Sequence, residues 1–431
     1  MAIFTINSAA LAVSNSYLFE YDVPSTTSNR VVTFSFSSND SGVLPIEGVW
    51  GDSFSQVINN TPILFVRNFA NNTSGTFTVT PNAPKTLDSI TSISFVYSSF
   101  NTNRFSQLNN VENVLLSKSS VQGDINNISK SILNFDTGSA SDVNAISGNI
   151  IDLPPTIEHF KIYGTNTLTG NYNSIPSSII SFVVLGNANL SGNTNSLKEG
   201  LLEFRVDNVQ FNAPFTLNTI SGNISDIPST VTDFRVSNNS LIGDVNDFSN
   251  NIEEVHINYN TYNSTGFQKD LRANEMGNDI GGLISDIPNN ITVFQIDGNN
   301  TISGLIENII TSATDYTLIL MGNNTVSGNI GGISGVRPTI LLGGSVTTNQ
   351  FTYTSRNWGN YSRFRLEIIN SNLSTNDVDQ MLIDMNNTFT NVNANTLVIR
   401  LTGLGGFRTN ASQTAFNNLV SQGANLFITL T

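Results

Sequence analysis

The sequence predicts a mixed fold: an all-β domain, then a repeat solenoid built on a parallel sheet, then short α/β units at the end of the chain. Three observations lead to this prediction. The start alternates apolar and polar residues, the middle repeats one phrase about every 22 residues, and the end carries apolar residues at helical spacing. The expected domains are residues 1–115, 116–350 and 351–431.

The first domain contains none of the repeated phrasing. Apolar and polar residues alternate in four of its segments: Arg30 to Ser37, Thr61 to Phe69, Gly75 to Thr80 and Ser89 to Tyr97. Alternation with period two is typical of half-buried strands, so we expect an antiparallel sandwich or a small barrel that serves attachment or assembly. The segment from Asn109 to Ser120 is either a linker or the first solenoid turn.

The repeated phrase reads ISGNI at Ile146, LTGNY at Leu168, ISGNI at Ile220 and IGGLI at Ile280. A fixed period of this length is typical of solenoids, in which each turn packs on the next. The intervals from Leu190 to Ile220 and from Leu241 to Ile280 are 30 and 39 residues. These two turns therefore carry insertions, at 206–219 and 258–279.

One repeat unit reads L-x-x-L-x-L-x-x-N-x-L through Val231, Phe234, Val236, Asn239 and Leu241. This pattern resembles the leucine-rich repeat. The resemblance implies a short strand with inward apolar residues, and an Asn side chain that ties its own turn to the next.

The Asn of the repeat pattern is expected at Asn187, Asn239, Asn299 and Asn323. Thr165 stands at this position in another unit and departs from the pattern. Prolines then follow at a constant place in the unit: Pro154, Pro176, Pro228 and Pro288. Since Pro fixes φ and cannot donate to a sheet ladder, we expect the back of each turn to be irregular or polyproline-like, with little regular helix.

The last eighty residues predict alternating strands and helices. Helical spacing runs from Ser374 to Asn387 and from Ala411 to Gln422, between strands expected at Phe364 to Ile369, Thr396 to Leu401 and Leu426 to Leu430. Such units would close a leucine-rich solenoid as an α/β cap. They argue against a parallel β-helix, which is the alternative fold because its rungs have similar length.

The closing passage carries a second resemblance. NLSTNDVDQMLIDMN, TLVIRLTG and TNASQTAFNNLVSQGANLFITLT resemble the carboxyl-terminal end of leucine-rich-repeat proteins carried by phages and bacteria. The likeness covers about 372 to 431, and RLTGLGGFR departs from the usual strand ending. It implies a role on a virion surface or in adhesion, without naming a ligand.

Composition limits the partners. Lys and Arg number 18 against 32 Asp and Glu, which gives a net charge of −14, so we expect no nucleic-acid partner. The chain has no cysteine and no apolar run long enough for membrane insertion. The amino terminus lacks the features of a secretory signal. We therefore expect a virion location, with assembly in the host cytoplasm and release by lysis; an extracellular or cell-surface location is the alternative.

We expect no catalytic residues, no metal site and no cofactor. His159 and His256 lie about one hundred residues apart, and both are expected to face solvent on strands. Asp152, Asp226 and Asp286 recur with the fold, which favours turn chemistry over a hydrolase carboxylate pair.

Candidate ligand-binding residues lie on the open strand face and in the insertions. With the apolar strand residues inward, one outward column contains Lys161, Val183, Arg205, Arg235, His256, Gln295 and Ile319. A second column contains Glu158 or His159, Ser181, Glu203, Asp233, Glu254, Val293 and Thr317. The insertion from Tyr259 adds Tyr262, Lys269 and Arg272, although a helix packed on the convex side is an equal alternative there.

These features predict a non-enzymatic phage virion protein, such as a tail fibre, baseplate protein or capsid-surface appendage. Its expected task is adhesion to a host surface glycan or protein, with the first domain contacting other virion proteins or forming a homo-oligomer. The alternatives are capsid decoration without host binding, a bacterial surface adhesin and a polysaccharide depolymerase.

Overall fold

The computed structural model divides the chain into two compact units, which are described separately. Unit 1 is Met1–Asn189 with Asn208–Thr216, and unit 2 is Leu190–Asp207 with Leu217–Thr431. The structure describes residues 17–22, 30–37, 46–50, 55–58, 63–69, 74–81, 89–96, 98–117, 119–138, 144–164, 166–186, 188–207, 219–237, 239–257, 278–296, 298, 300–309, 313, 315–335, 337–343, 350–359, 361–389, 392–393, 396–403 and 408–429.

Unit 1 begins with antiparallel strands. They are β1 (Tyr17–Asp22), β2 (Arg30–Ser37), β3 (Ile46–Trp50), β4 (Ser55–Ile58), β5 (Ile63–Phe69), β6 (Ser74–Pro81), β7 (Ser92–Val96) and β8 (Ser98–Asn101). One sheet has the order β8-β1-β6-β3-β4, and the other has the order β7-β2-β5. The rings of Phe34 and Phe77, one from each sheet, stack 4.6 Å apart in the core between them.

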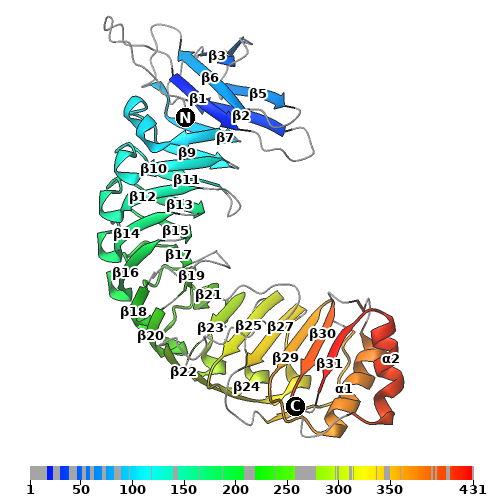
Figure 1. The fold of residues 1–431 in the computed structure, drawn as a ribbon. Coiled ribbons are helices and arrows are strands. Elements are labelled where there is room, and N and C mark those ends of the chain that lie inside the picture. The colour runs from blue at the N-terminus through cyan, green and yellow to red at the C-terminus, as the bar shows by residue number, and fades with distance from the viewer. Residues whose placement is uncertain are drawn as a thin grey trace, which may run out of the picture. The chain divides into compact units, whose positions relative to one another are not determined.

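The two antiparallel sheets of unit 1 run directly into the solenoid (Figure 1). β7 pairs in parallel with β9 (Asn113–Ser117), and β8 pairs in parallel with β10 (Ser120–Asp124). The segment from Asn109 to Ser120 therefore includes the first strand of the solenoid. We name the sheet that contains β9 sheet B and the sheet that contains β10 sheet A.

Each solenoid turn supplies one strand to sheet B, one strand to sheet A and a short 3-10 helix. In unit 1, sheet B continues with β11 (Asn134–Asp136), β13 (His159–Gly164) and β15 (Ser181–Gly186), and sheet A with β12 (Ala145–Asn149) and β14 (Thr167–Asn171). The 3-10 helices are η2 (Thr102–Gln107), η3 (Ile125–Asn127), η4 (Ile150–Asp152) and η5 (Tyr172–Ser174).

Unit 2 repeats this arrangement. Its sheet B strands are β17 (Glu203–Asp207), β19 (Asp233–Val236), β21 (Glu254–Ile257), β23 (Val293–Ile296), β25 (Asp315–Met321) and β27 (Arg337–Gly343). Its sheet A strands are β16 (Asn189–Asn193), β18 (Thr219–Asn223), β20 (Asn239–Asp244), β22 (Asp279–Leu283), β24 (Thr301–Leu305), β26 (Thr325–Asn329) and β28 (Phe351–Thr352). The 3-10 helices are η6 (Thr194–Ser196), η7 (Ile224–Asp226), η8 (Val245–Asp247), η10 (Ile284–Asp286), η11 (Ile306–Asn308) and η12 (Ile330–Gly332).

The prediction of an irregular back to each turn is wrong in part, because the S-G-N phrase forms a second parallel sheet, whereas the expected scarcity of regular helix is confirmed by the short 3-10 helices that follow it. Gly148 in β12 has φ +117, and a Cβ there would lie 2.6 Å from Asp124, so only glycine fits. Asn149 then caps η4 by accepting the Ile151 N–H at 3.1 Å. The residue before the proline, Leu153 with φ −56 and ψ 143, has the expected polyproline-like conformation.

A ladder of buried Asn side chains joins successive turns. Asn239 is buried at its predicted position, but in two other turns the register differs from the prediction. Asn166 is fully buried, and its Oδ1 accepts the Ile146 N–H at 3.1 Å, so the turn with Thr165 is not weakened. Asn324 accepts the Ile302 N–H at 2.9 Å, whereas Asn323 is exposed. The amide therefore sits one residue later than expected in these turns; Thr165, Asn187 and Asn299 lie outside the described residues.

Aromatic rings stack inside the turns of each unit. In unit 1 the ring of Phe160 lies 5.9 Å from that of Phe135 and 5.9 Å from that of Phe182. In unit 2 the rings of Phe204 and Phe234 lie 5.8 Å apart. All five rings are fully buried, so the strands that carry them direct one face into the core.

Unit 2 ends in alternating strands and helices, β29 (Phe364–Ile368), α1 (Thr375–Thr388), β30 (Leu397–Leu401), η13 (Asn410–Ser412), α2 (Gln413–Ser421) and β31 (Asn425–Ile428). The three strands extend sheet B in parallel, and α1 and α2 lie beside them (Figure 1). Ser374 and Asp377 form a capping box that begins α1. No helix in the described part of the chain is long and apolar enough to cross a membrane.

We expect Asn166→Ala to lower the free energy of unfolding by about 1–3 kcal/mol, since it leaves the buried Ile146 N–H without an acceptor. Urea unfolding of the full chain measures this change. The matched control is Asn126→Ala, at an exposed Asn on η3, which should stay within about 0.5 kcal/mol of the wild type. Equal effects of the two substitutions would show that the buried amide ladder does not hold the turns.

Candidate functional site

The middle strands of sheet B in unit 2 bring charged residues into register. In the parallel pairing of β17, β19 and β21, Glu203 lies opposite Asp233, which lies opposite Glu254. Two residues further along, Arg205, Arg235 and His256 are aligned in the same way. Residues i and i+2 of a strand share one face, so acids and bases form two adjacent columns on the face that points away from the core.

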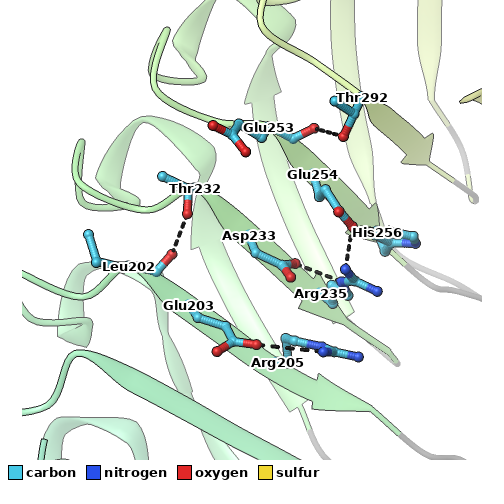
Figure 2. Close-up of polar contacts among 10 residues, drawn as sticks. All are labelled: Leu202, Glu203, Arg205, Thr232, Asp233, Arg235, Glu253, Glu254, His256 and Thr292. Atoms are coloured by element: carbon cyan, nitrogen blue, oxygen red, sulfur yellow. Dashed lines mark hydrogen bonds and ion pairs between the residues drawn. The ribbon is translucent and has the colours of Figure 1, made fainter. Parts of the chain in front are cut away.

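We name these six residues the charged ladder: Glu203, Arg205, Asp233, Arg235, Glu254 and His256. Figure 2 shows their side chains reaching toward one another along and across the strands.

Arg235 bonds to two acidic members of the charged ladder. Its Nε donates to Asp233 Oδ1 at 2.7 Å, and its Nη2 donates to Oε2 of Glu254 on the next strand. His256 Nε2 lies 3.5 Å from the same Glu254 oxygen, and Arg205 Nη1 lies 3.5 Å from Glu203 Oε1. Arg235 thus joins two strands, whereas Arg205 pairs within its own strand.

Threonines at the strand starts hold this register. The Thr232 N–H and hydroxyl both donate to the Leu202 carbonyl, at 2.8 and 3.2 Å. Thr292 makes the same pair of bonds to the Glu253 carbonyl, at 2.7 and 3.1 Å (Figure 2). These bonds tie each strand start to the preceding turn, so the acidic column lies at a well-fixed edge of the sheet.

Burial and pairing shift the pKa values of the charged ladder in different directions. Burial raises the pKa of Asp233, although its hydrogen bond from Arg235 and that positive charge oppose the shift. The nearby His256 side chain is the main cause that lowers the pKa of Glu254; burial opposes it and the charge of Arg235 adds to it. Burial acts to lower the pKa of Arg235, but Asp233 and Glu254 outweigh it and raise that pKa.

The charged ladder suits recognition of a charged or polar partner. Its side chains are about one-fifth to one-third exposed, apart from His256 at 10%, so they contact solvent while remaining held in place. Among the described residues, no group of three or more His, Asp or Glu is arranged to hold a metal ion.

The other residues predicted for the two columns differ in how far they are exposed. Lys161 and His159 are half-buried on β13 in unit 1, and the pairing with Ser181 places His159, not Glu158, in the second column. The expectation that His256 faces solvent is wrong, since it is 8% exposed. Gln295, at 2% exposure, is also buried.

Less of the outward face of sheet B is exposed than the sequence predicted, because two of its apolar residues are buried. Val183 is fully buried and Ile319 is 5% exposed, although both belong to the outward column. Apolar side chains on that face favour contact with other parts of the chain over water. The charged ladder is therefore a local feature of sheet B. The predicted insertion residues Tyr259, Tyr262, Lys269 and Arg272 lie outside the described residues.

The structure contains a buried ionic group that we did not predict from the sequence. Glu367 in β29 is fully buried, with its Oε1 2.7 Å from Arg365 Nε and its Oε2 3.8 Å from Arg400 Nη1 on β30. Its Arg-x-Glu spacing mirrors the acid-x-base spacing of the charged ladder, and that shared i, i+2 pattern is the signal that could have found it.

Comparisons with known proteins find little similarity. No protein-family model matches the chain, and a search of curated proteins finds no match. Among solved structures, the plant peptide hormone receptor RGFR1 in complex with RGF2 is similar with a TM-score of 0.37 and 13% identity, covering 77% of this chain and 68% of that one. A plant ice-binding protein is similar with a TM-score of 0.27 and 16% identity, covering 57% of this chain and 67% of that one.

The fold itself defines the class: a mostly β solenoid with long parallel sheets and few helices. Within that class, this chain is distinguished by the charged ladder on β17, β19 and β21.

We expect Glu254→Gln to destabilise the protein at neutral pH and to lose this effect in acid. A lowered folded-state pKa means that ionised Glu254 contributes stability above the unfolded value of about 4.3, and that this contribution is lost as pH falls through the folded value. Urea unfolding at pH 7, 5, 4 and 3 measures the difference from the wild type. Glu253→Gln, at the adjacent exposed acid, is the control, and a difference that persists at pH 3 would contradict the assignment.

Proposed function

We propose that this protein is a non-enzymatic binding protein of a virion surface that adheres to a host-surface partner through the charged ladder. The observation that carries the proposal is that, among the described strands of sheet B, acid-x-base pairs occur on three consecutive strands. The next strand along the same face, β23, has Val293 and Gln295 at the corresponding positions. The repeat therefore does not require charges there.

Acid-x-base pairs of this kind contribute little to the stability of the folded chain. Ion pairs that remain in contact with water contribute about 1 kcal/mol or less each, because water screens them and long side chains lose freedom. Arranged charges contribute more to the choice and orientation of a partner than to the fold. A local departure from the repeat, with little value for stability, favours a role in recognition.

The two insertions support the same location. In the sequence, the predicted insertion at 206–219 begins at the end of β17 and the one at 258–279 begins directly after β21, the first and third strands of the charged ladder. Segments connected to a rigid sheet commonly carry recognition. Tyr259, Tyr262, Lys269 and Arg272 remain predicted contributors to binding.

The placement on a virion draws on the resemblance of residues 372–431 to leucine-rich-repeat proteins of phages and bacteria. In this proposal the solenoid is of the leucine-rich-repeat type, the antiparallel strands of unit 1 contact other virion proteins, and the carboxyl-terminal helices cap the solenoid. An acidic chain with a net charge of −14 is compatible with display in water.

Binding of the labelled full chain to intact cells of a candidate host tests the proposal. We expect Arg205→Ala and Arg235→Ala to weaken binding about tenfold or more, since each removes a partly desolvated charge from the contact. Lys130→Ala is the control, because this exposed lysine bonds to the Asp152 carbonyl and belongs to unit 1, whereas the charged ladder belongs to unit 2.

Circular dichroism and thermal unfolding check that each variant is folded. Loss of binding in both arginine variants but not in Lys130→Ala supports adhesion through the charged ladder. Unchanged binding in folded Arg205→Ala and Arg235→Ala would contradict that surface. Attachment to virions without any binding to cells would favour capsid decoration instead.

A further inference from the structure

Two leucines replace a capping residue of the repeat on sheet A of unit 2. In four turns of this unit, the last residue of the sheet A strand is Asn or Asp, and its side-chain oxygen accepts an N–H from the 3-10 helix that follows: Asn193, Asn223, Asp244 and Asn329. Leu283 and Leu305 stand at this place before η10 and η11, and neither caps its helix. An uncapped helix start is less stable than a capped one, so the needs of the turn do not explain these leucines.

The turn that contains Leu283 is otherwise a close copy of a capped turn. Residues 222–228 read GNISDIP and residues 282–288 read GLISDIP, so one residue alone differs. Asn223 Oδ1 accepts the Ser225 N–H at 2.9 Å, whereas Leu283 offers no such acceptor to the matching Ser285 N–H. The repeat therefore accommodates an amide at this place, and the leucine is a local departure from it.

Both leucines lie on the outward face of sheet A. Leu283 is 48% exposed and Leu305 is 42% exposed. In the pairing of β22 and β24, Leu283 lies opposite Ser303, and Leu305 follows two residues later on the same face. We name Leu283 and Leu305 the leucine pair. A partner that covers the leucine pair removes this apolar surface from water, which favours binding.

The charged residues of the elements that carry and flank the leucine pair are all acidic. In β20, β22, β24 and β26 and the 3-10 helices that follow them, five residues carry charge: Asp244, Asp247, Asp279, Asp286 and Glu307. No Lys or Arg occurs in these described elements. Like charges disfavour a second copy of this face, nucleic acid and anionic membranes, and they favour a partner that carries Lys or Arg.

We propose that the leucine pair is a docking surface for a cationic amphipathic segment of another protein. The aliphatic side chains of that segment cover Leu283 and Leu305, while its Lys or Arg side chains face the acidic residues around them. This inference goes beyond the proposed function, because the leucine pair lies on sheet A and the charged ladder lies on sheet B. Adhesion through the charged ladder and docking on the leucine pair can therefore succeed or fail independently.

Binding of a fluorescent peptide to the full chain tests the surface. The probe is a peptide of leucine and lysine whose leucines recur at helical spacing, and a peptide of the same pattern with glutamate in place of lysine is the control probe. We expect Leu283→Asn and Leu305→Asn each to weaken binding of the lysine peptide about fivefold, since roughly half of a leucine side chain no longer leaves water.

Variants elsewhere separate this surface from general attraction to an acidic chain. Ile151→Asn removes an isoleucine that is 66% exposed on η4 of unit 1, and it should leave binding unchanged. Asp244→Asn removes one charge and keeps an oxygen that can cap η8, as Asn223 caps η7, so it should weaken binding about twofold.

Thermal unfolding supplies a second readout that a structural role of the leucine would reverse. Leu283→Asn restores the cap of the matching turn, so we expect it to raise the midpoint of unfolding by about 1–2 °C while it weakens binding. A lowered midpoint would show that Leu283 serves the fold, and it would overturn the proposal.

The remaining results decide which partner the leucine pair takes. No binding of the lysine peptide by the folded wild type, or equal binding by the wild type, Leu283→Asn and Leu305→Asn, overturns the docking surface. Self-association of the wild type in sedimentation that Leu283→Asn abolishes assigns this face to a second copy instead. Binding that needs both leucines, spares Ile151→Asn and rejects the glutamate peptide supports the proposal.

Discussion

Hydrogen bonds between successive turns hold this fold together. A turn of about 22 residues cannot bury its own apolar face, so it must pack on the next turn, and these bonds fix how the two turns align. Buried amides are the most specific of these bonds. Asn144 accepts the Val121 N–H at 2.9 Å, and Asn278 accepts the Leu241 N–H at 2.8 Å, each from the preceding turn. A buried N–H without such an acceptor would lower the stability of the folded chain.

This constraint explains why the charged ladder is so regular. Phe204, Phe234 and Val255 are fully buried and lie opposite one another in the pairing of β17, β19 and β21. Once these inward residues are aligned, the residues on either side of them are aligned as well. Acids then lie opposite acids and bases opposite bases, and the network forms through contacts between the two columns.

Much of this arrangement could be predicted from the sequence, because its signals are periodic. The repeat of about 22 residues indicated a parallel solenoid, and the i, i+2 spacing placed Glu203 beside Arg205 and Asp233 beside Arg235. Helical spacing after Ser374 corresponds to α1. In each case the local pattern predicts one local geometry, whichever parts of the chain pack around it.

What could not be predicted depends on contacts between turns. The second sheet arises because glycines such as Gly148 adopt positive φ and Asn149 caps the following turn, and a proline-rich return path suggested neither. The choice of Asn324 over Asn323 depends on which amide reaches a buried N–H. The burial of Val183 and Gln295 depends on long-range packing, to which a strand pattern gives no guide.

The parallel pairing of equivalent strands has a consequence for how such a chain can change in evolution. Duplication or loss of one whole turn leaves the remaining strands with partners of the same kind, since each turn meets an equivalent turn on either side. Such an event changes the length of both sheets by one strand spacing, about 4.8 Å, and spares the chemistry of the other turns. The length of the solenoid can therefore vary in steps of one turn while the residues on β17, β19 and β21 stay unchanged.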